Sequence, residues 1–301
     1  MRIHSVTKVY QFSGHKNCIY SLNYSLHADA FYSGGAEGYL VEWNHKTRQD
    51  GQLVANVNKA IYSICALPEQ QQVLAGTAIG GIHVIDLKQK KETRHIEAHT
   101  LGVFCMLLHQ NNLYTSGEDG MLHQWDPADF KLLHSVKVSN KSTRTIAISA
   151  QRNELATGSS DNKIRLYDLQ TLELKQEIDA HTHSVFALAY SPDQTHLLSG
   201  GRDAHLHSYV CDDHYKQVQK IPAHLLHINQ IRFNPSGNLL ATCSMDKSIK
   251  IWAAQSLELL KVIDRVKSGG HISSVNALLW LDDHTLLSGS DDREIMLWEV
   301  R

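Results

Sequence analysis

Residues 286–300 read Leu286-Leu287-Ser288-Gly289-Ser290-Asp291-Asp292-Arg293-Glu294-Ile295-Met296-Leu297-Trp298-Glu299-Val300. Two apolar runs, at 286–287 and 295–298, flank a short polar stretch centred on Asp292. Apolar runs separated by a tight polar turn are typical of a strand that turns back to pair with its own continuation. The stretch therefore predicts a β-hairpin.

The same hairpin recurs upstream. Asp292 and Trp298 stand six residues apart, and this spacing returns in Asp246/Trp252, Asp203/Tyr209, Asp161/Tyr167, Asp119/Trp125 and, with a glutamate, Glu37/Trp43. Successive aspartates lie 42 to 46 residues apart, and the gap between Glu37 and Asp119 leaves room for one more copy. Histidines that follow Gly or Ala open five of the units, at Gly14-His15, Ala98-His99, Ala180-His181, Ala223-His224 and Gly270-His271. A period of roughly 40 to 45 residues is typical of a propeller blade, so we expect seven blades.

The histidine openings, the acid-to-aromatic spacing and the closing Trp125-Asp126 resemble the repeats of the WD-repeat β-propeller family. The resemblance covers the chain from end to end and implies an all-β fold, a seven-bladed β-propeller of four-stranded antiparallel blades. Such units bury their faces only against their neighbours, so residues 1–301 are expected to form a single propeller. The expected blades span approximately 15–56, 57–98, 99–138, 139–180, 181–223, 224–265 and 271–301, the last together with 5–12.

Residues 5–12 alternate like a strand but precede the first Gly-His pair, while the last unit stops one strand short. In the family the N-terminal strand completes the last blade, which leaves no unpaired gap in the ring. We therefore expect residues 5–12 to be the outer strand of the seventh blade.

The charge of the chain is nearly balanced, with a formal net charge of −2 and 20% charged residues. Nucleic-acid binding needs a basic surface, so no nucleic-acid partner is expected. The first residues lack the apolar run of a signal peptide, and no apolar run approaches the roughly 20 residues of a membrane helix. The sequence therefore predicts a cytoplasmic protein that does not bind membranes.

The chain has five cysteines, an odd number with wide spacing, which indicates reduced core residues. The pairs His181/His183 and His205/His207 would each place two imidazoles on one face of a strand, an arrangement that suits a metal ion. A third ligand is not evident in the sequence. We therefore predict neither a metal site nor a cofactor.

Four positions recur in each unit: the opening His, a Ser or Thr four residues before the acid, the acid, and the closing aromatic residue. In the family these side chains form a hydrogen-bonded chain within the blade. A catalytic triad occurs once in a protein, whereas this set repeats, so the resemblance implies a structural role. The complete tetrads are His99, Thr115, Asp119, Trp125; His224, Thr242, Asp246, Trp252; and His271, Ser288, Asp292, Trp298.

Three units depart from the pattern. In the second unit all four positions are apolar, Val57, Ala75, Ile79 and Ile85. Loss of every partner together is nearly neutral, but an acid placed at Ile79 is expected to be buried opposite Val57 and to destabilise the blade. The fourth and fifth units close on tyrosine, which can still donate one hydrogen bond; they read Ser139, Thr157, Asp161, Tyr167 and His181, Ser199, Asp203, Tyr209.

The resemblance also indicates where a ligand would bind. In the family the residue five after the opening position lies near the end of the innermost strand and faces the mouth of the central channel. Here these residues are Tyr20, Tyr62, Phe104, Arg144, Phe186, Asn229 and Asn276. The residue before each turn acid faces the same rim, which adds the charged residues Glu118, Arg202 and Asp291.

The favoured hypothesis is a non-enzymatic protein-protein interaction scaffold that binds a partner peptide at this aromatic mouth. A cation of the partner would enter between aromatic faces, and its acids would meet Arg144 or Arg202. The protein is expected to be a monomer alone or a subunit of a complex. The alternatives are a propeller enzyme, hydrolase or lyase, which usually gathers several His, Asp or Glu at the axis, and a purely structural subunit. Aromatic residues that simply fill the channel are a further alternative.

Overall fold

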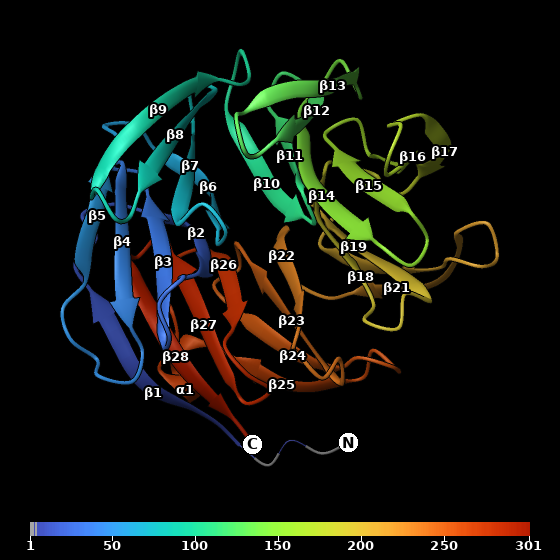
Figure 1. The fold of residues 1–301 in the computed structure, drawn as a ribbon. Helices are drawn as coiled ribbons and strands as arrows, with labels where there is room; N and C mark the ends of the chain where they lie inside the picture. The colour runs from blue at the N-terminus through green and yellow to red at the C-terminus, as the bar shows by residue number, and fades with distance from the viewer. Residues whose placement is uncertain (1–2, 4) are drawn as a thin grey trace.

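The computed structural model describes residue 3 and residues 5–301 of the chain. The described residues form seven antiparallel sheets of four strands each. Figure 1 shows these sheets arranged around a central axis. This confirms the predicted seven-bladed propeller. We number the blades one to seven from the first complete unit, and within each blade the strands follow one another from the axis outward.

The bounds of the strands follow, innermost first. Blade one contains β2 (Ile19–Tyr24), β3 (Ala30–Gly35), β4 (Tyr39–Asn44) and β5 (Gln52–Asn56). Blade two contains β6 (Ile61–Leu67), β7 (Gln72–Thr77), β8 (Gly81–Asp86) and β9 (Lys91–Glu97). Blade three contains β10 (Val103–His109), β11 (Asn112–Gly117), β12 (Met121–Asp126) and β13 (Lys131–Lys137). Blade four contains β14 (Thr143–Ser149), β15 (Glu154–Ser159), β16 (Lys163–Asp168) and β17 (Leu174–Asp179). Blade five contains β18 (Val185–Tyr190), β19 (His196–Gly201), β20 (His205–Val210) and β21 (Lys216–Pro222). Blade six contains β22 (Ile228–Phe233), β23 (Leu239–Ser244), β24 (Ile249–Ala253) and β25 (Leu259–Ile263). Blade seven contains β26 (Val275–Trp280), β27 (Thr285–Ser290), β28 (Glu294–Val300) and β1 (Val6–Ser13).

Burial changes from the second strand of a blade to its outer strand. All six residues of β23 are buried, whereas β9, with the sequence KETRHIE, is exposed at all but one position. The second strands are covered on both faces by neighbouring blades, so they are apolar or carry small residues. The polar outer strands form the wall of the ring.

The first and last segments of the chain pair with each other, as predicted. Strand β1 runs antiparallel to β28, with Phe12 opposite Ile295, and Figure 1 shows the blue and red strands side by side. Phe12 is buried, and its ring lies 5.3 Å from that of Phe31 and 5.6 Å from that of Trp43. Strand β1 therefore completes the ladder of blade seven and also packs against blade one.

Close contact between blades depends on small residues in the second strands. A Cβ atom at Gly34 would lie 2.6 Å from Ile61 of the next blade, and one at Gly200 would lie 2.7 Å from Ile228. Since carbon atoms do not approach so closely, these positions exclude a side chain unless the neighbour moves. The glycines thus set the spacing between adjacent blades.

A short helix, α1 (Arg265–Ser268), interrupts the link between blades six and seven. It accounts for the larger number of residues between Asp246 and Asp292, because the links between the other blades contain no helix among the described residues. At four residues it is the single helix in the described part of the chain, and it falls far short of the length needed to cross a bilayer.

Candidate binding site at the channel mouth

Each residue that the sequence places at the channel mouth is the second residue of an innermost strand, and all of them are half-buried. At this residue the pairing with the second strand shifts register in every blade. In β2, Ile19 pairs with Gly35 and Ser21 with Gly34, so Tyr20 is the extra residue of a β-bulge. A bulge redirects the side chain of its extra residue. The fold thus presents one side chain per blade at the mouth, namely Tyr20, Tyr62, Phe104, Arg144, Phe186, Asn229 and Asn276.

The aromatic members of the mouth contact one another along an arc that starts at blade one. The Tyr20 and Tyr62 ring centroids are 5.3 Å apart, edge to face, and those of Tyr62 and Phe104 are 5.6 Å apart and stacked. The arc ends where Phe186 meets His227 edge to face, with their ring centroids 5.2 Å apart. Such pairs stabilise each other beyond simple burial, so the arc is a fixed surface rather than a set of independent side chains.

Arg144 bridges the arc between blades three and five. Its Cζ atom lies 4.8 Å from the ring centroid of Phe104 and 5.0 Å from that of Phe186. The chain's own guanidinium therefore occupies the space between Phe104 and Phe186, one of the places where a cation of the partner could have entered between aromatic faces. The sequence placed Arg144 between two phenylalanine positions, but it could not show that the guanidinium turns toward both rings.

The remaining mouth residues hold neighbouring blades together. The Asn229 side-chain amide donates to the Val275 carbonyl oxygen at 2.8 Å. The Asn276 amide donates to the Ile19 carbonyl oxygen at 2.9 Å and to the Asp291 carboxylate at 2.7 Å. These two asparagines, predicted as partner-binding residues, thus have structural partners across the seams on either side of blade seven.

The charged rim residues differ in exposure. Glu118 and Arg202 are exposed, whereas Asp291 is half-buried beside Tyr20. Burial, with the nearby Cys18 and Asp291, raises the pKa of Tyr20 to about 12, so its hydroxyl is a neutral hydrogen-bond donor at physiological pH.

The predicted tetrads form hydrogen-bonded chains inside the blades. In blade three, His99 Nδ1 lies 2.9 Å from Asp119 and Nε2 lies 2.9 Å from Thr115 Oγ1, to which the Trp125 indole donates at 3.0 Å. Burial alone would raise the pKa of Asp119, but the His99 contact and two backbone amides lower it to about 2. The same contacts join His224, Thr242, Asp246, Trp252, and His271, Ser288, Asp292, Trp298.

Blade one has a complete tetrad as well, although its acid is a glutamate. His15 lies 2.6 Å from both Glu37 and Ser33, and the Trp43 indole donates to Ser33 at 2.7 Å. The extra methylene of glutamate therefore keeps the links to His15 and through Ser33 to Trp43, but Glu37 Oε2 is buried without a hydrogen-bond partner among the described residues.

Blades four and five replace the missing members of the tetrad differently. In blade five the Tyr209 hydroxyl donates to the Ala180 carbonyl oxygen at 3.2 Å. In blade four, where Ser139 replaces the histidine, Arg165 contacts the Asp161 carboxylate at 2.8 Å. The sequence contains Arg165, but nothing in the repeat pattern assigns it this compensating role.

The expectation for blade two was partly wrong. Val57, Ala75 and Ile85 are buried, but Ile79 is 57% exposed in the turn between β7 and β8. In blades three, six and seven the acid at this position points inward because it bonds the opening histidine. Blade two has no such histidine, and the side chain of Ile79 faces solvent. An acid at position 79 would therefore not be buried opposite Val57.

Two clusters of side chains could supply metal ligands. In His99, Asp119, His123 and in His181, Asp203, His207, the ligand atoms lie within 4.8 Å of one another. The histidine pairs noted in the sequence are divided, since His183 is exposed and His207 instead stacks on His181 with ring centroids 4.0 Å apart. Both nitrogens of His99 already bond Asp119 and Thr115, so a metal would have to displace these structural links.

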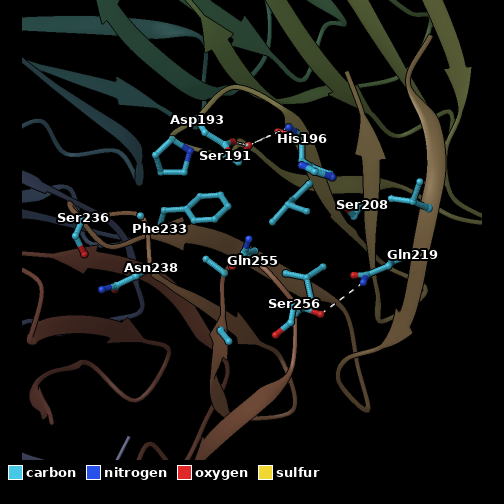
Figure 2. A pocket seen from close by; sticks show the side chains of 17 residues that line it. Ser191, Asp193, His196, Ser208, Gln219, Phe233, Ser236, Asn238, Gln255 and Ser256 are labelled. Atoms are coloured by element: carbon cyan, nitrogen blue, oxygen red, sulfur yellow. Dashed lines mark hydrogen bonds between the residues drawn. The ribbon is translucent and has the colours of Figure 1, made fainter. Parts of the chain in front are cut away.

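A groove of about 590 Å³ lies between blades five and six, at the opposite end of the innermost strands (Figure 2). It contains serine, aspartate and histidine, the residue types of a hydrolase. However, Ser191 Oγ donates to Asp193 at 2.6 Å, and His196 Nδ1 lies 2.8 Å from Thr195 Oγ1. In a Ser-His-Asp hydrolase the serine hydroxyl donates to the imidazole, which is not the arrangement here, so this groove gives no support to the enzyme alternative.

Comparison with known proteins assigns the repeats. The family model described as "WD domain, G-beta repeat" matches well over half of the chain, at residues 6–44, 90–126, 130–168, 172–209, 215–253 and 263–299. The chain belongs to this WD-repeat family. Each matched segment from 90 onward, like the first, begins at or near an outer strand and ends with the third strand of the next blade. The interval 45–89 between matches contains most of blade two, which lacks the tetrad.

Curated relatives share shorter stretches with this WD-repeat chain. A WD repeat-containing protein 55 homolog from Drosophila willistoni is 31% identical over 99 residues, 33% of this chain and 19% of that protein. The target of rapamycin complex subunit LST8 from Bos taurus is 39% identical over 61 residues, 20% of this chain and 18% of that protein. The nuclear distribution protein PAC1 from Coccidioides posadasii is 36% identical over 90 residues, 27% of this chain and 18% of that protein. The matches thus span about a fifth of each relative's length.

Proposed function

We propose that this protein is a non-catalytic interaction scaffold that binds a segment of a partner protein at the channel mouth. The observation that carries the proposal is the contiguous arc of half-buried aromatic rings and one arginine, each redirected by a bulge. Interface hot spots are enriched in aromatic residues and arginine, and they gather at the centre of a contact patch.

The family supports the proposal at a coarser level. One similar protein, LST8, is named as a subunit of the target of rapamycin complex, so a WD-repeat chain of this kind can work within an assembly. The five free cysteines fit a reducing compartment such as the cytoplasm. A place within an assembly and a cytoplasmic location are thus parts of the proposal.

The test uses two tyrosines at opposite ends of strand β2. Tyr20 is the bulge residue at the mouth, whereas Tyr24, 50% exposed, ends the strand at the other side of the ring. The parent, the Tyr20→Ala/Tyr62→Ala double variant and the Tyr24→Ala variant would be used to capture partners from the native cell, with identification by mass spectrometry. We expect the double variant to lose the main partner and Tyr24→Ala to retain it.

Measurement of the affinity for the purified partner then gives the size of the binding loss in the double variant. Loss of two hot-spot rings should weaken binding by at least about 2 kcal/mol, roughly thirtyfold. The melting temperature should change little, because both rings are only half-buried. A partner held equally by all three proteins would move the interface to the blade sides, and loss with Tyr24→Ala alone would move it to the opposite face.

A further inference from the structure

The guanidinium of Arg144 is a cation held in a fixed position at the channel mouth. The rings of Phe104 and Phe186 flank it, and its Nε donates to Ser160 Oγ at 2.8 Å. No carboxylate in the described part of the chain lies within ion-pair distance of Arg144. The terminal nitrogens of the guanidinium are therefore available to an acceptor from outside.

Two further basic groups lie close to Arg144. His227 contacts Phe186, with ring centroids 5.2 Å apart, and Arg202 is exposed on the rim of blade five. Burial lowers the pKa of His227, and the charges of Arg202 and Arg144 lower it further, in that order. Three basic groups of blades four, five and six thus share one region of the mouth.

One acid opposes this cluster. Glu118, exposed on the rim of blade three, is the carboxylate whose charge acts on Arg144, but it lies beyond ion-pair distance. At the corresponding rim positions, blades four and six carry Ser160 and Met245. The basic side of the mouth is therefore not neutralised by its own rim.

We propose that Arg144, assisted by Arg202, receives an anionic group of the bound segment, either a carboxylate or a phosphate. This inference rests on the proposed function and specifies the chemistry of the partner. Arginine presents parallel donors that match either group, and such charge-assisted bonds are strong. Because two rings and Ser160 already fix the guanidinium, little conformational entropy is lost when the anion binds.

The first experiment measures the charge preference of the mouth with defined probes. Four capped, fluorescent nonapeptide mixtures would carry Glu, phosphoserine, Gln or Lys at the centre of random flanks, and fluorescence anisotropy would report binding. We expect the Glu or the phosphoserine mixture to bind at least about tenfold more tightly than the Gln and Lys mixtures. The order of these two mixtures distinguishes carboxylate from phosphate. Equal binding of all four mixtures, or no binding of either anionic mixture, would overturn the inference.

The second experiment assigns the preference to Arg144. Arg144→Gln and Arg202→Gln should each weaken binding of the anionic probe, the former about tenfold or more, and Glu118→Gln should strengthen it. The matched control is Arg94→Gln, because Arg94 lies 5.5 Å from the centroid of Phe130 in a similar contact on the blade side. This control should bind as the parent does.

The outcomes separate this inference from the proposed function. If Tyr20→Ala/Tyr62→Ala abolishes partner binding while Arg144→Gln, Arg202→Gln and Glu118→Gln leave it unchanged, the mouth binds a partner but not through an anion. If the anionic probes bind with the expected preference while the tyrosine variant keeps its partner, the anion site stands and the proposed scaffold function at the mouth fails. Arg202 is exposed, so its variant tests the inference even if Arg144→Gln folds poorly.

Discussion

A single polar side chain in a blade stabilises the protein only when its partners are present. His271 illustrates this, since it is buried and bonds both Asp292 and Ser288. Removal of Asp292 would leave a desolvated imidazole nitrogen without a partner, and an unpaired buried group costs more than the hydrogen bond itself contributes. The same acid position in blade two is occupied by an exposed Ile79, so no buried group depends on it.

We therefore predict opposite responses at these two equivalent positions. Asp292→Ala should lower the free energy of unfolding by about 1 to 3 kcal/mol. Ile79→Asp should change it by no more than about 0.5 kcal/mol, because the new carboxylate faces solvent. Urea unfolding monitored by tryptophan fluorescence measures both. A loss for Ile79→Asp as large as that for Asp292→Ala would mean that this turn packs against the core.

Two buried histidines predict a dependence of stability on pH. Burial, with the adjacent His99, lowers the pKa of His123 from 6.5 to about 4, and burial with the adjacent His181 does the same for His207. Below about pH 6.5 the unfolded chain binds protons that the folded chain does not, so stability is complete above that pH and falls as the pH drops towards 4.

Replacement of both histidines by methionine should flatten this dependence. Methionine is suitable because Met296 occupies the equivalent position in blade seven, where it is buried. His123→Met/His207→Met should remove a loss of roughly 2 to 3 kcal/mol per histidine between pH 6.5 and pH 4, as measured by urea unfolding across this range. The control is His183→Met, since His183 is exposed. An unchanged slope in the double variant would show that the two imidazoles are not the groups that titrate.

At the scale of strands, the sequence pattern predicted the features that recur in every blade. It missed the features that depend on contacts between blades. The acid-to-aromatic spacing located the second and third strands of the blades, because each pair is a local hairpin. The bulges at Tyr20 and its equivalents were not predicted, because no particular residue type in the sequence marks a register shift. The family resemblance alone placed those side chains at the mouth.

The roles of Arg144 and Asn276 show the same limit. Both positions were predicted to face the mouth, but the partners that fix them lie on neighbouring blades: the rings of Phe104 and Phe186 in one case, and the carbonyl oxygen of Ile19 in the other. Ile19 and Asn276 are separated by almost the whole sequence and meet only because the ring closes. Contacts of this kind become visible only in three dimensions.

At the scale of the whole molecule, the ring has one seam that differs from the rest. Blade seven is assembled from both ends of the sequence, with β1 hydrogen-bonded to β28. Phe12 of β1 also packs on Phe31 and Trp43 of blade one. Strand β1 therefore has two separable contributions, a backbone ladder that covers the edge of β28 and a buried ring at the seam.

Two variants separate these contributions. Deletion of residues 1–12 should expose the edge of β28, and an exposed, apolar edge strand is a template for aggregation. Phe12→Ala keeps the ladder and removes only the ring, so it should cost about 3 to 5 kcal/mol without causing aggregation. Light scattering during a thermal melt distinguishes the two, because only in the truncated chain should aggregation begin below that variant's own melting temperature. The Lys8→Ala variant, which removes a 2.8 Å hydrogen bond to the Gly269 carbonyl oxygen, controls for side-chain contacts of β1.

A truncated chain as soluble and as heat-stable as the parent would mean that the ring does not need β1 to close. Aggregation of Phe12→Ala would show instead that the packing of Phe12 at the seam holds the strand in place.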